Sequence, residues 1–107
     1  MKQGNLDKMV RGWFVGEFTP AILNTQACEV GVKTYQAGDY EEAHYHKIAV
    51  EVTLIISGRV QMCDREWGPG DIIVIEPGEI TDFRAITNVT NVVVKVPSVM
   101  NDKYLAK

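Results

Sequence analysis

Short apolar runs recur at regular spacing along the chain, separated by glycine, proline, asparagine and aspartate. The runs are rich in valine, isoleucine, threonine and aromatic residues, which favour β-strands. No window of a dozen residues has the apolar spacing of an amphipathic helix. The pattern predicts eight strands, at residues 12–18, 27–36, 44–46, 50–57, 59–63, 71–75, 82–86 and 89–96.

Turn residues mark the breaks between these strands. Each break supplies a glycine that can adopt a positive φ or a proline that ends strand pairing, as at Gly38-Asp39, Ser57-Gly58, Gly68-Pro69-Gly70 and Pro77-Gly78. Many short strands joined by tight turns indicate an all-β sandwich or barrel. Because no linker or repeat interrupts the pattern, we expect one domain over residues 1–107.

The segment 50–57, VEVTLIIS, has one mixed and one aliphatic face. Alternation places Val52, Leu54 and Ile56 on the aliphatic face and begins the other face with Glu51. A glutamate inside a barrel is costly unless it meets a metal, a hydrogen-bond donor or a ligand. The aliphatic face and the valines at 92–94 provide more apolar side chains than the interior of one small barrel can bury. We therefore predict a homodimer that covers the excess.

Composition and charge favour a folded domain and argue against nucleic-acid binding. The chain is 46% hydrophobic and 23% charged, as in folded domains, and its net charge is -3 with scattered basic residues, which gives no support to nucleic-acid binding. The N-terminus lacks the apolar run of a secretory signal or membrane span. Cys28 and Cys63 have no CxxC partner, so we expect buried, unpaired thiols and a cytoplasmic location.

The two histidines of the chain, His44 and His46, are separated by one residue. On a strand, residues two apart point to the same side, so both imidazoles should face one cavity. With the carboxylate of Glu51 they would form a ligand set suited to divalent Fe, Mn, Ni, Co or Zn. The same residues could instead form hydrogen-bonded pocket walls around a small organic ligand, or belong to a barrel without any ligand.

The spacing of these residues resembles the first motif of the cupins. That motif reads Gly38, five residues, His44-x-His46, four residues, Glu51, six residues and Gly58. A second motif begins with Gly70-Asp71, continues as an apolar run and reaches Pro77-Gly78. The resemblance covers residues 38 to about 85, with the first motif at 38–58 and the second at 70–85.

The resemblance implies a small double-stranded β-helix, or jelly-roll barrel, with a metal held by His44, His46 and Glu51. The third imidazole ligand of metal-binding cupins should follow Gly78 by three residues, but Thr81 occupies that position. Asp82 is the candidate substitute ligand, provided that a bulge or shifted register turns it inward.

Two functions follow from this comparison. The first is a metal-dependent enzyme acting on a small polar metabolite, with dioxygenase-, isomerase- or decarboxylase-like chemistry as in cupin relatives. Thr81, Asp82 and Glu76 are then the candidate proton carriers. The second is a non-catalytic barrel that binds a sugar-like or carboxylate-bearing small molecule without metal.

Other residues near the motif are expected to pack or to face solvent and not to take part in the site. Tyr45 alternates with the two histidines and should face away from them. Glu41 and Glu42 are expected in a solvated loop before the histidine strand. Trp13 belongs to an aromatic cluster for which packing, at one end of the barrel or against a second subunit, is the expected role.

Overall fold

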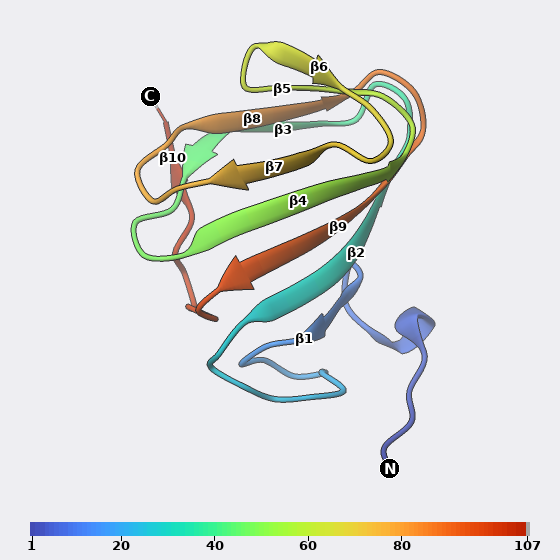
Figure 1. Ribbon diagram of the computed structural model, residues 1–107. Helices are drawn as coiled ribbons and strands as arrows, with labels where there is room; N and C mark the ends of the chain where they lie inside the picture. Colours follow the sequence, from blue (N-terminus) through green and yellow to red (C-terminus); the bar gives the residue numbers. More distant parts are fainter. Residues whose placement is uncertain (107) are drawn as a thin grey trace.

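Two antiparallel five-stranded sheets face each other in the computed structural model, which describes residues 1–106 (Figure 1). Lys107, the last residue of the predicted domain, lies outside the described residues. One sheet has the order β1 (Trp13–Val15), β2 (Glu29–Tyr35), β9 (Val89–Val96), β4 (Val50–Ser57) and β7 (Ile72–Ile75). The other has the order β10 (Tyr104–Leu105), β3 (Tyr40–Tyr45), β8 (Thr81–Ala85), β5 (Val60–Met62) and β6 (Arg65–Trp67).

The all-β prediction is confirmed, and both boundaries of the strands at 50–57 and 89–96 are correct. The sequence pattern missed β6, β10 and a short 3-10 helix, η1 (Leu6–Lys8), because two or three residues are too few to show periodicity. Strand β3 begins at Tyr40, so the loop predicted for Glu41 and Glu42 is wrong. No helix in residues 1–106 is long and apolar enough to span a membrane.

Both cysteines are free. Cys28 is partly buried, whereas Cys63 is exposed, so the prediction of a buried thiol is wrong at Cys63. The reason is local, because Cys63 and Asp64 form the turn between β5 and β6, and both have positive φ.

The interior between the sheets is apolar at one end and polar at the other. The apolar end is a cluster formed by Ile55, Val60, Met62, Ile73, Ile75, Phe83, Ala85 and Val89. The buried polar residues nearer the other end are His44, His46, Glu51, Thr53, Thr81 and Asn91. Strand β4 runs through both regions, since Glu51 and Thr53 in its first half and Ile55 in its second half all point inward. The polar end is therefore where the interior can hold a ligand.

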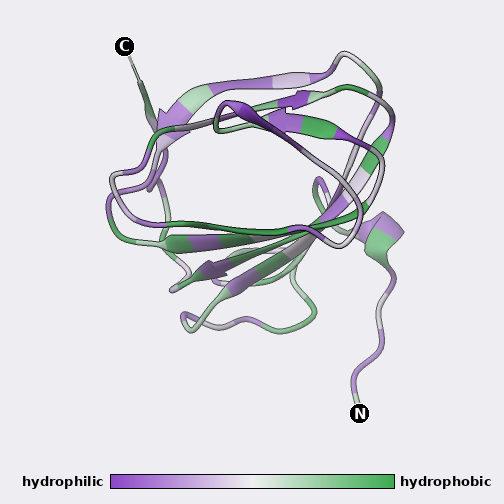
Figure 2. Cartoon of the chain, turned by 45° about the horizontal axis from the view of Figure 1, so that its top comes forward, coloured by the Kyte–Doolittle hydropathy of each residue, from purple (hydrophilic) through white to green (hydrophobic). Residues whose placement is uncertain are grey.

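The aliphatic face of β4 points outward, as the strand alternation predicts. Figure 2 shows hydrophobic and hydrophilic residues alternating along the strands of this sheet. Pairing with β7, β9 and β2 aligns the outward side chains in two rows, Val74–Val52–Val94–Val30 and Ile72–Leu54–Val92–Val32. Ile72 and Val74 are 62% and 53% exposed. The sheet thus carries a broad apolar outer surface.

The C-terminal segment is tied to the barrel by one carboxylate. Asp102 is buried and accepts hydrogen bonds from the backbone N–H groups of Lys47, Ile48 and Ala49, at 3.0, 3.2 and 2.9 Å. Burial alone would raise the pKa of Asp102, but these three donors favour the charged form and leave the pKa below its ordinary value of 3.8. The segment then continues into β10, which pairs with β3.

We predict that Asp102→Asn lowers the free energy of unfolding by about 2–4 kcal/mol, because an amide cannot accept all three hydrogen bonds. Since the folded-state pKa is depressed, this stabilisation is complete above pH 3.8 and is lost as the pH falls through the lower folded-state value. Urea unfolding from pH 7 to pH 3 measures both effects. The exposed Asp7→Asn is the matched control, and equal stability of the two variants at pH 7 would contradict the anchoring role.

Candidate metal and ligand site

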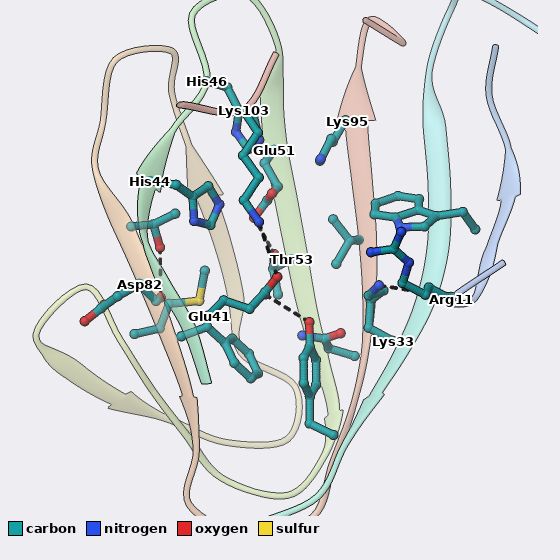
Figure 3. A pocket seen from close by; sticks show the side chains of 17 residues that line it. Arg11, Lys33, Glu41, His44, His46, Glu51, Thr53, Asp82, Lys95 and Lys103 are labelled. Carbon is teal, nitrogen blue, oxygen red and sulfur yellow. Dashed lines mark hydrogen bonds and ion pairs between the residues drawn. The ribbon is translucent and has the colours of Figure 1, made fainter. Parts of the chain in front are cut away.

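A cavity of about 210 Å³ occupies the polar end of the interior (Figure 3). A water molecule takes about 30 Å³ in the liquid, so this volume suits a few waters or a small metabolite. His44, His46, Glu51, Thr53, Thr81 and Asn91 are among the residues lining it. The structure thus brings the three predicted ligands from the first motif to one cavity.

A bulge in β3 determines which of its side chains enter the cavity. The pairing of β3 with β8 matches Glu41 with Phe83 and His44 with Thr81, with a shift in register between the two pairs. Regular alternation would place Glu41 and His44 on opposite faces, but the bulge turns both inward. In the sequence analysis, an inward-pointing Asp82 required a bulge or shifted register. The irregularity lies instead in β3, between Glu41 and His44, and it is Glu41 that it turns inward.

The ring of His44 has one nitrogen committed to the backbone. Its Nδ1 lies 2.8 Å from the carbonyl oxygen of Glu42. A carbonyl only accepts, so Nδ1 carries the hydrogen, and in the neutral ring Nε2 has a free lone pair. Metal-binding histidines typically have this arrangement, with the second nitrogen donating to a carbonyl or carboxylate.

His46 lies next to His44, with ring centroids 5.4 Å apart and ring planes at 80°. It is 3% exposed, and burial, with repulsion from Lys95 and His44, lowers its pKa from 6.5 to about 4. The ring is therefore neutral at pH 7. His46 Nε2 and Asn91 Oδ1 are the two buried side-chain atoms in residues 1–106 that lack a hydrogen-bond partner. Both residues line the cavity, so a missing polar partner belongs there.

Glu51 projects toward the cavity from β4, on the sheet opposite the histidines. It is 8% exposed, and its Oε2 accepts a hydrogen bond from Thr53 Oγ1 at 3.2 Å. No lysine or arginine in the described part of the chain forms an ion pair with it. A buried carboxylate with so few donors has acceptor capacity left for a ligand or a cation.

The donor types fit a divalent first-row metal, since two imidazoles and a carboxylate are available. The unpartnered Nε2 of His46 and the free Nε2 of His44 support this fit. In residues 1–106, however, no three His, Cys, Asp or Glu side chains are arranged as a complete metal-binding group. Glu51 would have to turn from Thr53 toward the imidazoles to serve as the third ligand.

The fourth proposed ligand, Asp82, is not brought to this group. Asp82 is one of the residues lining the cavity, but its side chain is exposed on β8 and is turned away from the histidines in Figure 3. Its Oδ1 accepts a hydrogen bond from the N–H of Cys63 at 3.2 Å. Regular alternation along β8 explains the outcome, because the buried Thr81 and Phe83 on either side of Asp82 point inward.

The two other candidate proton carriers are also poorly placed. Thr81 points inward opposite His44, but its hydroxyl donates to the carbonyl oxygen of Asp82 at 3.1 Å and accepts from the thiol of Cys63 at 3.3 Å. Glu76 is exposed in the turn after β7 and does not line the cavity. As the structure stands, none of the three has a proton positioned for transfer at the histidines.

Glu41, which the sequence analysis did not select, is an acidic group that lines the cavity. Its Oε2 accepts a hydrogen bond from the hydroxyl of Tyr35 at 3.1 Å, and its Oε1 lies 3.9 Å from Lys103 Nζ. Burial and the charge of Glu41 raise the pKa of Tyr35, so the phenol remains protonated. Tyr35 can therefore act as a donor at the cavity but not as a base.

Four basic residues of the cavity were not identified from the sequence: Arg11, Lys33, Lys95 and Lys103. Alternation could have found two of them, because Lys33 shares a face with Gly31 in β2 and Lys95 shares a face with Asn91 and Val93 in β9. No periodicity could have found Arg11 and Lys103, because both lie outside the strands. Trp13 also lines the cavity instead of serving only in packing.

Comparisons with known proteins identify the fold. No family model matches the chain, and its sequence matches no curated protein. A solved Klebsiella pneumoniae protein with a double-stranded β-helix domain is 22% identical, with a TM-score of 0.70 over 77% of this chain and 72% of its own. The chain has the double-stranded β-helix fold of the cupins.

Two enzymes share this cupin fold. DMSP lyase DddQ from Ruegeria pomeroyi is 22% identical, with a TM-score of 0.73 over 98% of this chain and 56% of its own. Oxalate decarboxylase from Bacillus subtilis, which has Mn(II) centres, is 19% identical, with a TM-score of 0.64 over 76% of this chain and 24% of its own. The fold predicted from the two motifs is therefore confirmed.

We predict that His46 in the metal-free protein stays neutral until the pH falls close to 4. The unfolded chain takes up this proton near pH 6.5, so the stabilisation is complete above pH 6.5 and is lost as the pH falls toward 4. Titration by nuclear magnetic resonance and acid-dependent unfolding measure the two effects. His46→Gln should remove this part of the pH dependence, and an ordinary titration near 6.5 would disprove the burial argument.

Proposed function

We propose that this barrel binds a divalent metal ion, Fe, Mn, Ni, Co or Zn, through His44, His46 and Glu51 and acts on a small polar metabolite. The observation that carries the proposal is the unpartnered Nε2 of His46 beside His44, whose Nδ1–H is held by a backbone carbonyl. Oxalate decarboxylase supports it as a protein of the same fold with metal centres.

Residues around the metal ligands would bind the metabolite and accept its protons. A bound divalent metal would supply Lewis-acid polarisation of a substrate oxygen. Tyr35 would hold Glu41 in place by donating its phenol hydrogen to it, and Glu41 would accept protons or hydrogen bonds from the ligand at the same wall. Asn91 Oδ1 would accept a hydrogen bond from a ligand hydroxyl, which the protein itself does not provide.

The metal proposal predicts about one metal ion per chain in untagged protein. His46→Ala and Glu51→Gln should each lower the metal content at least about tenfold, because each variant removes one of three ligands. Inductively coupled plasma mass spectrometry measures the content after purification and after loading with Fe(II), Mn(II), Co(II), Ni(II) or Zn(II).

Asp82→Asn is the matched control, because the Asp82 carboxylate is turned away from the histidines and accepts a hydrogen bond from Cys63, so the variant should leave the metal content unchanged. Failure of the wild-type protein to retain any of the five metals would refute the metal proposal. A control variant that loses metal as His46→Ala does would instead restore Asp82 as a ligand.

A second candidate function is a metal-free barrel that binds a small molecule without turnover. The absence of a complete three-ligand group in residues 1–106 and the threonine opposite His44 favour it. The unpaired Asn91 Oδ1 also suits a hydroxylated ligand as well as it suits a metal-bound substrate. A metal-free wild-type protein that binds small polar molecules would decide for this function.

We further propose that the barrel forms a homodimer through the outer face of the sheet containing β4. The two rows of aliphatic side chains across β7, β4, β9 and β2 are contiguous and carry no charge, which suits a second copy of the same surface. A cytoplasmic location, predicted from the unpaired cysteines, stays a prediction.

We predict that light scattering gives a mass twice the 12.0 kDa of the chain. Leu54→Lys, at the centre of the aliphatic rows, should give the monomer mass, because a buried lysine at a symmetric interface repels its copy. Gln61→Lys, exposed on the other sheet, is the control and should stay dimeric. A monomeric wild-type protein would overturn the proposed dimer.

A further inference from the structure

The cavity lining combines four cationic side chains with the three carboxylates of Glu41, Glu51 and Asp82, in a chain whose net charge is -3. Arg11, Lys33, Lys95 and Lys103 line this cavity, and they make up four of the eleven basic residues. They come from four separate segments: the turn before β1, strand β2, strand β9 and the loop before β10. Only tertiary structure brings these charges together.

Three of the four cations lack an acidic partner. Lys103 lies 3.9 Å from the carboxylate of Glu41. Within residues 1–106, Arg11, Lys33 and Lys95 form no ion pair with an aspartate or glutamate. The one hydrogen bond between members of this group runs from Lys33 Nζ to the backbone carbonyl of Arg11, at 3.0 Å. Like charges held together in this way repel each other unless an anion joins them.

Trp13 holds the two lysines at the same place. The ammonium groups of Lys33 and Lys95 lie 5.3 and 5.1 Å from the centre of its ring. Both distances are within the range of cation–π attraction. Figure 3 shows Arg11 reaching the same region from the turn before β1. The indole therefore positions two positive charges beside a third.

The turn that carries Arg11 has a constrained backbone. Arg11 and Gly12 have φ values of 52° and 84°, in the left-handed region. A Cβ at Gly12 would collide with the carbonyl oxygen of Val32, so the turn lies directly against β2. The N–H of Val32 also donates to the carbonyl of Gly12 at 3.0 Å. This close packing fixes Arg11 at the cavity mouth.

We propose that Arg11, Lys33 and Lys95 form an anion-binding subsite that holds the carboxylate or phosphate group of the ligand. The subsite deepens the proposed function and rests on it, because it assigns the metabolite near the histidines to the class of oxyanions. Arginine and lysine donors form charge-assisted hydrogen bonds with carboxylate and phosphate oxygens. Burial lowers the pKa of Lys33, the charge of Glu41 raises it in part, and repulsion by Arg11, Lys95 and Lys103 lowers it; a bound anion would raise it further.

The test is anion binding by metal-stripped wild-type protein at low ionic strength. Malonate and inorganic phosphate are titrated separately by calorimetry, so that the two arms distinguish a carboxylate from a phosphate ligand. We expect at least one of them to bind, and Lys33→Gln with Lys95→Gln to weaken that binding about 100-fold, or about tenfold for each lost cation. Arg11→Gln alone should weaken it about tenfold.

Lys8→Gln is the matched control, because Lys8 is exposed in η1 and does not line the cavity. It should bind the anions as the wild-type protein does. No binding of either anion, or equal binding by the lysine double variant, would overturn the subsite.

Measuring metal content and anion binding in the same variants distinguishes a failure of the anion subsite from a failure of the metal site. The double variant should retain metal, and His46→Ala should retain anion binding. Anion binding that depends on the lysines in a protein that never takes up metal would support the subsite and refute only the metal site.

Discussion

The pairing of β4 with β9 is the constraint on which the rest of the structure depends. Each strand has eight residues, and their alternation separates an inward from an outward face at every step. The inward face changes from polar to apolar along the pair, from Glu51 and Lys95 at one end to Ile55 and Val89 at the other. The same alternation sends valine and leucine outward, so the pocket and the apolar outer surface are two consequences of one register.

Burying unpaired polar atoms at the polar end of the interior costs free energy of folding, and this cost is the physical argument for a bound ligand. Burial keeps His46 neutral and leaves its Nε2 without a partner. Asn91 Oδ1 is unpaired for the same reason. A packed apolar core would avoid both penalties, so a ligand that supplies the missing partners gives the arrangement a physical explanation. The cations without an acidic partner add a second requirement, for negative charge, and a ligand with both a hydroxyl and an anionic group would meet both.

Local deviations from regular structure decide which groups reach the cavity. The bulge in β3 turns Glu41 inward with His44, whereas regular alternation in β8 turns the Asp82 side chain away from the histidines. The left-handed turn at Arg11 and Gly12 delivers a guanidinium group from outside the barrel strands. Asp102, by capping three backbone N–H groups, holds the segment that carries Lys103. Each of these details depends on backbone contacts between distant parts of the chain.

The sequence by itself determined the all-β class, the bounds of β4 and β9, the two faces of β4 and the placement of His44, His46 and Glu51 at one cavity. Strand alternation has a period of two residues, and a motif with fixed spacing records it directly. Only the tertiary structure decided that the carboxylate of Asp82 is bonded to the backbone of Cys63, that Glu76 lies outside the cavity, and that Arg11, Lys33, Lys95 and Lys103 line it. The reason is physical: bulges, turn conformations and the pairing of distant strands depend on contacts that a linear pattern does not contain.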